Sequence, residues 1–451
     1  MAPLADTSQG TALGTRTSSV HAPVDGRNIG STTRARISNG STGAVPSIVL
    51  LTPPMQHYGY YDTVRSELFD FYAAFHAAAA SVGQRAILVA NPSPRVNIDD
   101  GSWHELRKRG VPESDLLRGL LDDIWVRDYF PTQLRDDHVA KFAFATAYLD
   151  RGDVSYIASS TDRTVDRWDI PGLVRHDNLV LYGGGIVFDP TSSLAIVTER
   201  VLRDNPRLAG RPGEGLEPAA ECCPADPYGL LSGDDPYGNF TADELRSGSQ
   251  RLAQELGLRK VAIVPEEPGV PRLGHVDGIA NFLAPDVVAL SAFGDEAVYA
   301  LYERIIFDAF AGIATNVTVV PFPYAPTIDV WEIDGFESAK GVYVNFLRTK
   351  SATYIPTFGL PEDDEALQIA NAYGDVPAVA VDAEAVSVMG GSVRCLSQHL
   401  WDAPADVVLS RALVSTTEPA PSSPASSYKP SFGHQGILAL GIAILFFIKC
   451  A

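Results

Sequence analysis

The sequence predicts an α/β domain, because short apolar runs typical of buried strands alternate with helical patterns. The strand-like runs begin at Ser47 and are SIVLLTPP, AILVANP, VAIVPE, VVALSAF, VTVVPFP and GVYVNFL. In the clearest helical segment, TVRSELFDFYAAFHAAAASVG, one face collects the apolar residues Val64, Leu68, Phe71, Tyr72 and Phe75. Two further helices are expected at Ala242–Leu256 and Glu296–Ala311.

Composition and charge narrow the functional class. With 451 residues, 45% of them hydrophobic and 20% charged, the chain can bury a sizeable core. The net charge of −20 argues against nucleic-acid binding, because no basic stripe is available to neutralise phosphates. A negative field concentrates cationic ligands, although solubility alone explains the charge equally well.

We expect the folded domain to occupy residues 45–413. Residues 1–44 are rich in Ser, Thr, Gly and Ala and show no periodicity, so we predict that they are disordered. They also lack the apolar stretch of a secretory signal. Inside the domain, residues 206–239 break the pattern with two copies of DPYG and the adjacent pair Cys222–Cys223. Because a loop of this length is uncommon in a compact domain, we interpret it as an insertion.

The chain closes with a Ser/Pro-rich linker at 414–435 and a hydrophobic tail at 436–451. As a helix, the apolar part of the tail would span about 20 Å, short of a hydrocarbon core of about 30 Å. Small residues, a polar spacer and an apolar tail match the signal for a cleaved lipid anchor. That interpretation predicts an extracellular or cell-surface protein attached to a membrane, with a weak membrane anchor as the alternative.

Cys395 is the candidate nucleophile. The chain has four cysteines, and their spacing is typical neither of a zinc site nor of a disulfide framework. Cys395 stands in VMGGSVRCLSQH, shortly after Gly390 and Gly391, which allow the backbone to present the thiol into a cleft. Since an isolated cysteine is often only a small buried hydrophobe, its neighbours must decide.

Two segments offer charged partners. Asp128 lies in DDIWVRDYFP beside Trp125, and a carboxylate accepts two parallel N–H bonds from a guanidinium; ordinary surface charges are the alternative. His275 and Asp277 lie two residues apart in LGHVDG, so in an extended segment they project from one face, over a pocket or simply at the surface. A histidine in such a pocket would be a proton shuttle.

Two more segments contain polar or glycine residues where the pattern is apolar. LYGGGIVFD, which ends in Asp189, follows a strand, and its glycines permit a sharp turn or the close approach of a ligand. Asn345 interrupts the apolar run GVYVNFL, so its amide needs either structural partners or a ligand.

Together these segments resemble the family of agmatine deiminases and bacterial, Porphyromonas-type peptidylarginine deiminases. The resemblance runs in the family's order from Trp125 to Cys395. The matching motifs are Trp125, Arg127, Asp128 and Pro131, the Gly-Gly turn ending in Asp189, TERVLRDNP, GHVD, YVNFL with YIPTFG, and GGSVRC.

The resemblance implies a pentein fold, a five-bladed α/β-propeller of ββαβ units. It implies that Cys395 attacks the guanidinium carbon, that His275 protonates ammonia and activates water, and that Asp128 and Asp277 hold the guanidinium. It also implies that Asn345 orients the catalytic set, with Trp125 and Asp189 on the substrate side. No metal or organic cofactor is required.

Departures from the family pattern bear on the substrate. Tyr182 and Val187 stand where agmatine deiminases carry glutamate and histidine, and Arg394 replaces a histidine. Arg151 lies where a carboxylate-binding arginine of peptidylarginine deiminases is expected. We therefore expect a peptidyl-arginine deiminase that forms citrulline through a covalent thiouronium. The alternatives are a cytoplasmic agmatine deiminase that makes N-carbamoylputrescine, an amidinotransferase, and a catalytically silent propeller that binds cationic peptides.

Overall fold

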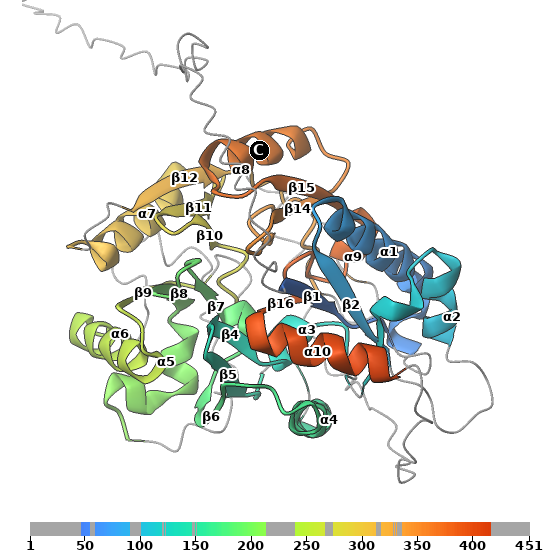
Figure 1. Cartoon of the computed structure of the whole chain (residues 1–451). Helices are drawn as coiled ribbons and strands as arrows, with labels where there is room; N and C mark the ends of the chain where they lie inside the picture. Colours follow the sequence, from blue (N-terminus) through green and yellow to red (C-terminus); the bar gives the residue numbers. More distant parts are fainter. Residues whose placement is uncertain are drawn as a thin grey trace, which may run out of the picture. The chain divides into compact units, whose positions relative to one another are not determined.

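The computed structural model divides the chain into two units, Met1–Ala44 and Val45–Ala451, and every residue described here belongs to the second (Figure 1). The described residues are 47–54, 59–90, 101–119, 121, 123–146, 149, 151–212, 240–266, 274–312, 317–327, 329, 331 and 336–415. The predictions for residues 1–44, the linker, the tail and Cys222–Cys223 lie outside these ranges. No helix in the described ranges is long and apolar enough to cross a membrane.

The strands in the described ranges form five sheets with one recurring pattern. In each sheet a central strand pairs antiparallel with one neighbour and parallel with the other. The first sheet contains β16 (Ser397–Trp401), β1 (Ser47–Leu51), β2 (Arg85–Ala90) and β3 (Leu116–Arg118). The second and third contain β4 (Thr132–Arg135), β5 (His138–Ala143) and β6 (Leu173–Val180), then β7 (Ile186–Phe188), β8 (Leu194–Thr198) and β9 (Lys260–Val264). The fourth and fifth contain β10 (Ala280–Ala284), β11 (Val287–Ser291) and β12 (Thr318–Phe322), then β13 (Leu347–Arg348), β14 (Thr353–Thr357) and β15 (Ala378–Asp382).

A helix connects the central strand of every sheet to its parallel neighbour, as parallel pairing requires a crossover; in the first sheet β2 also pairs parallel with β3. In chain order these helices are α1 (Arg65–Ser81), α4 (Arg151–Trp168), α6 (Ala242–Leu256), α7 (Glu296–Phe310) and α8 (Asp363–Tyr373). The remaining helices are short or terminal: α2 (Gly101–Lys108), α3 (Val126–Tyr129), α5 (Arg200–Asp204), α9 (Glu384–Ser387), α10 (Asp402–Ser415), and the 3-10 turns η1 (Gly59–Val64), η2 (Glu113–Asp115), η3 (Gly183–Gly185) and η4 (Pro206–Ala209). The α/β prediction is confirmed, and the order strand–strand–helix–strand recurs.

The local sequence explains where the longer helices begin and end. α6 starts with a capping box, in which the Thr241 side chain accepts from the Glu244 backbone and Glu244 bonds back, and it ends at Gly257 in the left-handed conformation. Its bounds are those predicted. In α1 the predicted apolar face is buried from Leu68 to Phe75, so burial of one helix face fixes its orientation.

Alternate side chains of β1 enter two different hydrophobic clusters. Val49 and Leu51 pack into one cluster, whereas Ile48 and Leu50 pack into another. Because both faces of the strand are covered, its sequence is a continuous apolar run rather than an alternating one.

Two details of the sequence prediction are corrected. In GVYVNFL only Leu347, with the following Arg348, is in a strand; before it lie a turn with an isolated bridge from Val342 to Tyr324, and then Asn345 and Phe346 outside helix, strand and turn. Gly341 requires the left-handed conformation there, with φ +87°. The predicted insertion at 206–239 begins inside the core, since Leu208 and Ala209 of η4 are buried; residues 213–239 lie outside the described residues.

Candidate active site

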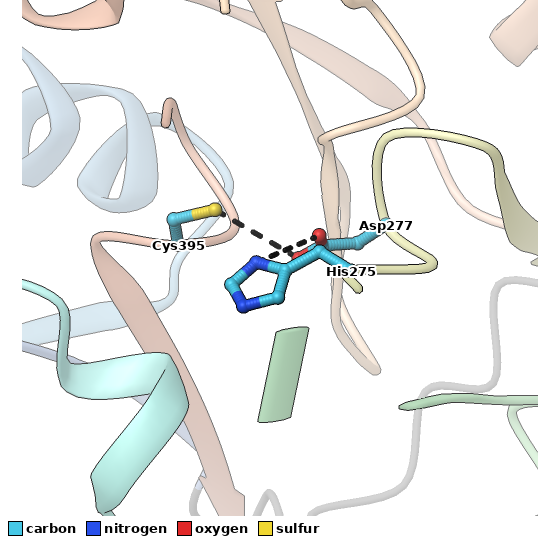
Figure 2. Close-up of side chains that lie close together, drawn as sticks. All are labelled: His275, Asp277 and Cys395. Atoms are coloured by element: carbon cyan, nitrogen blue, oxygen red, sulfur yellow. Dashed lines mark hydrogen bonds and ion pairs between the residues drawn. The ribbon is translucent and has the colours of Figure 1, made fainter. Parts of the chain in front are cut away.

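Cys395, His275 and Asp277 come together from two distant parts of the chain (Figure 2). Cys395 lies in the turn directly before β16, and the other two lie in the segment leading into β10. The Asp277 carboxylate is 3.8 Å from His275 Nδ1 through Oδ1, and 3.8 Å from Cys395 Sγ through Oδ2. Thiol, imidazole and carboxylate therefore face one small volume.

The segment that carries His275 and Asp277 is not extended, and that part of the prediction is wrong. It turns at Val276, whose carbonyl accepts from the backbone N–H of Ile279 and Ala280. The carbonyl of Gly184 accepts from the Val276 backbone N–H at 2.9 Å. The two side chains thus converge because a turn is held against the glycine segment, and not because they share one face of a strand.

Asp128 brings a second carboxylate to the other side of the imidazole. It lies in α3 and is buried, so it is not an ordinary surface charge. Its Oδ1 accepts from the Gly184 backbone N–H at 2.9 Å, and its Oδ2 lies 3.8 Å from His275 Nε2. Each ring nitrogen of His275 consequently faces one aspartate, an arrangement that can accept the N–H groups of a planar cation beside the ring.

Two glycines make this convergence possible. A Cβ on Gly184 would lie 2.5 Å from His275 Nδ1 and 2.9 Å from Asp128 Oδ1. A Cβ on Gly391 would lie 2.5 Å from the ring of the half-buried Trp125 and 3.0 Å from Cys395 Cβ. The two glycine turns noted in the sequence therefore serve close approach of protein segments to one another.

The Asn345 side chain is hydrogen-bonded to the Cys395 thiol. Its Nδ2 donates to Cys395 Sγ at 3.2 Å, and its Oδ1 accepts from Ser392 Oγ at 3.0 Å and from the Arg394 backbone N–H at 3.2 Å. The amide group therefore orients the loop that carries Cys395. Its role as an orienting residue in catalysis stays a prediction.

Arg394 is the site residue that sequence reasoning treated only as a departure. Its buried guanidinium donates from Nη1 to Asp277 Oδ2 at 2.7 Å and to the Gly183 carbonyl at 2.8 Å, and from Nη2 to the Ile186 carbonyl at 2.8 Å. A second buried arginine, Arg127, donates through Nε to the Arg394 carbonyl at 3.3 Å. The only sequence signal for Arg394 was a charged residue next to the cysteine.

Burial and charge both act on the Cys395 thiol. Burial raises the pKa of the Cys395 thiol well above its usual range, and the carboxylates of Asp277 and Asp128 raise that pKa further. The hydrogen bond from Asn345 opposes this shift. Without a bound cation the sulfur is therefore held as a thiol, and a positive charge placed beside it would favour the thiolate.

Two other predicted substrate residues lie in different settings. Asp189 accepts from the backbone N–H groups of Thr191 at 3.0 Å, Ser193 at 2.6 Å and Leu194 at 2.5 Å, which organises the turn between β7 and β8. These contacts do not support a substrate role for Asp189. Arg151 is the exposed first residue of α4, and its assignment to a substrate carboxylate stays a prediction.

The donor atoms of His275, Asp277 and Cys395 all lie within 4.8 Å of one another, a spacing that metal ligands also show. However, Asp277 already bonds the Arg394 guanidinium, and a divalent cation on the same carboxylate would meet that positive charge at close range. We therefore do not assign these residues as metal ligands. A planar organic cation, whose charge is spread over several atoms, fits the set better.

Comparison with known proteins gives a consistent picture. Residues 244–400 match the model of the Porphyromonas-type peptidyl-arginine deiminase family. A Listeria monocytogenes protein named "Putative agmatine deiminase 2" is 30% identical over 349 residues, which cover 70% of this chain and 85% of that protein. A Latilactobacillus sakei protein named "Putative agmatine deiminase" is 23% identical over 338 residues, covering 68% and 83%.

Solved structures show the same fold. The C. jejuni agmatine deiminase superimposes with a TM-score of 0.54 at 15% identity, covering 80% of this chain and 94% of that one. The agmatine deiminase of Enterococcus faecalis gives a TM-score of 0.53 at 17% identity, with the same coverage of 80% and 94%. The likeness identifies the α/β fold as a pentein fold.

Proposed function

Because the chain belongs to the family of agmatine deiminases and Porphyromonas-type peptidyl-arginine deiminases, and is thus a hydrolase of amidine C–N bonds, we propose that it deiminates agmatine through Cys395. The observation that carries this proposal is the placement of an aspartate at each nitrogen of His275, next to the thiol. That geometry suits a guanidinium carbon held between two carboxylates and a sulfur.

In the proposed reaction the thiol proton passes to His275, and the thiolate adds to the guanidinium carbon. The protonated imidazole then gives its proton to one amino group, which leaves as ammonia and leaves a thiouronium on Cys395. His275 next removes a proton from water, whose oxygen adds to the same carbon. Collapse of this adduct breaks the C–S bond and yields N-carbamoylputrescine, the thiol and, after proton transfer, ammonium. General acid–base help of this kind contributes about 10²–10⁴ in rate.

The choice of agmatine follows from the names of the relatives. Of the two departures from the agmatine deiminase pattern near the glycine turn, the one at Val187 gives little support to peptidyl-arginine. Val187 is fully buried in a hydrophobic cluster, so a valine in place of the family's histidine changes the packing of the core. Tyr182, by contrast, packs against His275 with ring centroids 5.1 Å apart. This tyrosine, in place of a glutamate, keeps peptidyl-arginine as the second candidate.

A substrate comparison tests the proposal. Purified protein is incubated with agmatine, with arginyl peptides blocked at both ends and with free arginine, and ammonia and the carbamoyl products are measured. We expect agmatine to be turned over with the highest kcat/KM. Turnover of the peptides alone would favour the second candidate, and a product that forms only with an added amine acceptor would indicate an amidinotransferase.

The nucleophile is tested separately. Cys395→Ser should abolish turnover and the covalent adduct, detected by mass spectrometry of quenched wild-type reactions. The matched control is Ser397→Ala, two residues further along the chain, which removes a hydroxyl group bonded to the Val393 carbonyl and leaves the thiol in place. Wild-type activity in the Cys395 variant would assign the chemistry to another residue.

For the fold, we further infer that the five ββαβ units are the blades of a closed five-bladed propeller. The recurrence of one strand pattern and one helix crossover in five sheets supports this. Since strand pairing does not join the sheets to one another in the described ranges, the closure itself stays a prediction.

A further inference from the structure

Arg394 gives the site a fixed positive charge at the carboxylate nearest the nucleophile. The guanidinium is buried and bonds Asp277 Oδ2 at 2.7 Å, the same oxygen that lies 3.8 Å from Cys395 Sγ. Charge-assisted hydrogen bonds of this length are among the stronger polar contacts in proteins. The charge of Asp277 is therefore offset at the oxygen that faces the sulfur.

The charges around the thiol balance when Arg394 is included. The charged or titratable groups that face Cys395, directly or through one contact, are Asp128, Asp277, Arg127, Arg394 and His275. With the imidazole neutral, the two aspartates and two arginines cancel. Without Arg394, the same set would carry one net negative charge, and a bound guanidinium would only neutralise it.

We propose that Arg394 is a positioning residue that keeps Asp277 in place and balances the charge of the site, so that an arriving guanidinium favours the thiolate of Cys395. The proposal rests on the proposed function, in which Cys395 is the nucleophile. With Arg394 present, the substrate brings one net positive charge to a neutral site. A positive charge near a sulfur stabilises its ionised form.

The contacts of Arg394 also explain why a histidine would not do the same. Its two Nη atoms bond the carbonyl of Gly183, the first residue of the glycine turn, and that of Ile186, the residue after it, in addition to Asp277. A planar guanidinium carries a permanent charge and offers N–H donors in several directions, whereas an imidazole offers at most two N–H donors. Arg394 therefore links the turn that supports Asp128 and His275 to the carboxylate beside the nucleophile.

The test measures thiol reactivity and requires no substrate. Alkylation of Cys395 by iodoacetamide is followed from pH 6 to 10, and the modified peptide is quantified by mass spectrometry so that the other cysteines do not contribute. In the Arg394→Gln variant, Cys395 should be alkylated about tenfold more slowly at a given pH. This corresponds to a shift of the curve of rate against pH by about one pH unit to higher pH. Arg394→Lys, which keeps the charge, should stay within about threefold of the wild type.

A second variant makes the test independent of folding defects in the first. Asp277→Asn removes a negative charge and should alkylate faster than the wild type, and the double variant with Arg394→Gln should return toward the wild-type rate. Arg348→Gln is the matched control, because Arg348 pairs with Asp375 away from the thiol. Changes of opposite sign cannot come from loosened packing alone.

Two results would overturn the proposal. One is an Arg394→Gln profile that coincides with the wild type, and the other is an Arg394→Lys variant as slow as Arg394→Gln, which would assign the effect to shape and not to charge. Because alkylation needs no substrate, both results are distinguishable from a failure to deiminate agmatine.

Discussion

Gly184 lies so close to His275 that a side chain on the glycine would collide with the imidazole. A Cβ built there stands 2.5 Å from Nδ1, while the Gly184 backbone N–H donates to Asp128 Oδ1 and its carbonyl accepts from Val276. One glycine thus places His275 and the Asp128 carboxylate relative to each other. The glycine triplet Gly183–Gly185 therefore helps to set the geometry of the site.

Gly184→Ala should therefore damage the reaction more than the fold. Overpacking in a buried region costs about 1–3 kcal/mol, so the protein should remain folded while kcat falls by at least tenfold. The measurements are steady-state kinetics and urea unfolding. Gly294→Ala is the control, since a Cβ at Gly294 has nothing within 4 Å. Full activity in Gly184→Ala would show that His275 tolerates displacement.

Asp128→Asn should weaken substrate binding and turnover. The change keeps the shape of the side chain but removes the charge, and each charge-assisted hydrogen bond contributes about 1.5–3 kcal/mol. We expect kcat/KM to fall by roughly ten- to a hundredfold, with a circular dichroism spectrum like that of the wild type. Asp166→Asn on α4, where Asp166 pairs with Arg175 at the surface, should leave the kinetics unchanged. Unaltered KM and kcat in the Asp128 variant would remove it from the guanidinium site.

The sequence singled out Cys395, His275, Asp128 and Asp277, and the structure brings their side chains close together; their catalytic roles, which the family resemblance implies, stay predictions. It could not show that Arg394 bonds Asp277, since the two are 117 residues apart and only the fold brings them together. The sequence also predicts that GHVD and GVYVNFL are extended, which is wrong for GHVD and for most of GVYVNFL. A buried apolar run looks the same in a strand and in a packed turn, and the difference lies in tertiary contacts such as that between Val276 and Gly184.

A buried acid next to the Glu266 carboxylate should make stability depend on pH. Burial, and after it the charge of Glu266, raise the pKa of Glu199 to about 8 against the opposing effect of an ion pair with Arg203. Because the folded pKa lies above the unfolded value of about 4.3, the folded state binds the proton more tightly. The resulting stability is complete below about pH 4 and is lost progressively as the pH rises toward 8.

Glu199→Gln removes this titration and should flatten the pH dependence of the free energy of unfolding over that range. Urea unfolding at pH 5, 6.5 and 8 measures the effect. The advantage of the variant over the wild type should grow from pH 5 to pH 8. Glu255→Gln on α6, where Glu255 pairs with the half-exposed Arg207, serves as the control and should leave the slope unchanged. Parallel curves for wild type and Glu199→Gln would mean that Glu199 is ionised throughout.

Asn345→Ala should separate placement of the thiol from substrate binding. The variant removes the donor to Cys395 Sγ and the acceptor of the Ser392 hydroxyl and of the Arg394 backbone N–H, so the loop that carries Cys395 loses these three hydrogen bonds. Leaving buried groups without partners costs about 1–3 kcal/mol each. We expect kcat to fall by about tenfold or more while KM changes little, because the carboxylates that hold the guanidinium remain. Asn371→Ala on α8, whose side chain bonds only backbone atoms, should behave like the wild type in activity. A rise in KM with unchanged kcat would instead assign Asn345 to substrate contact.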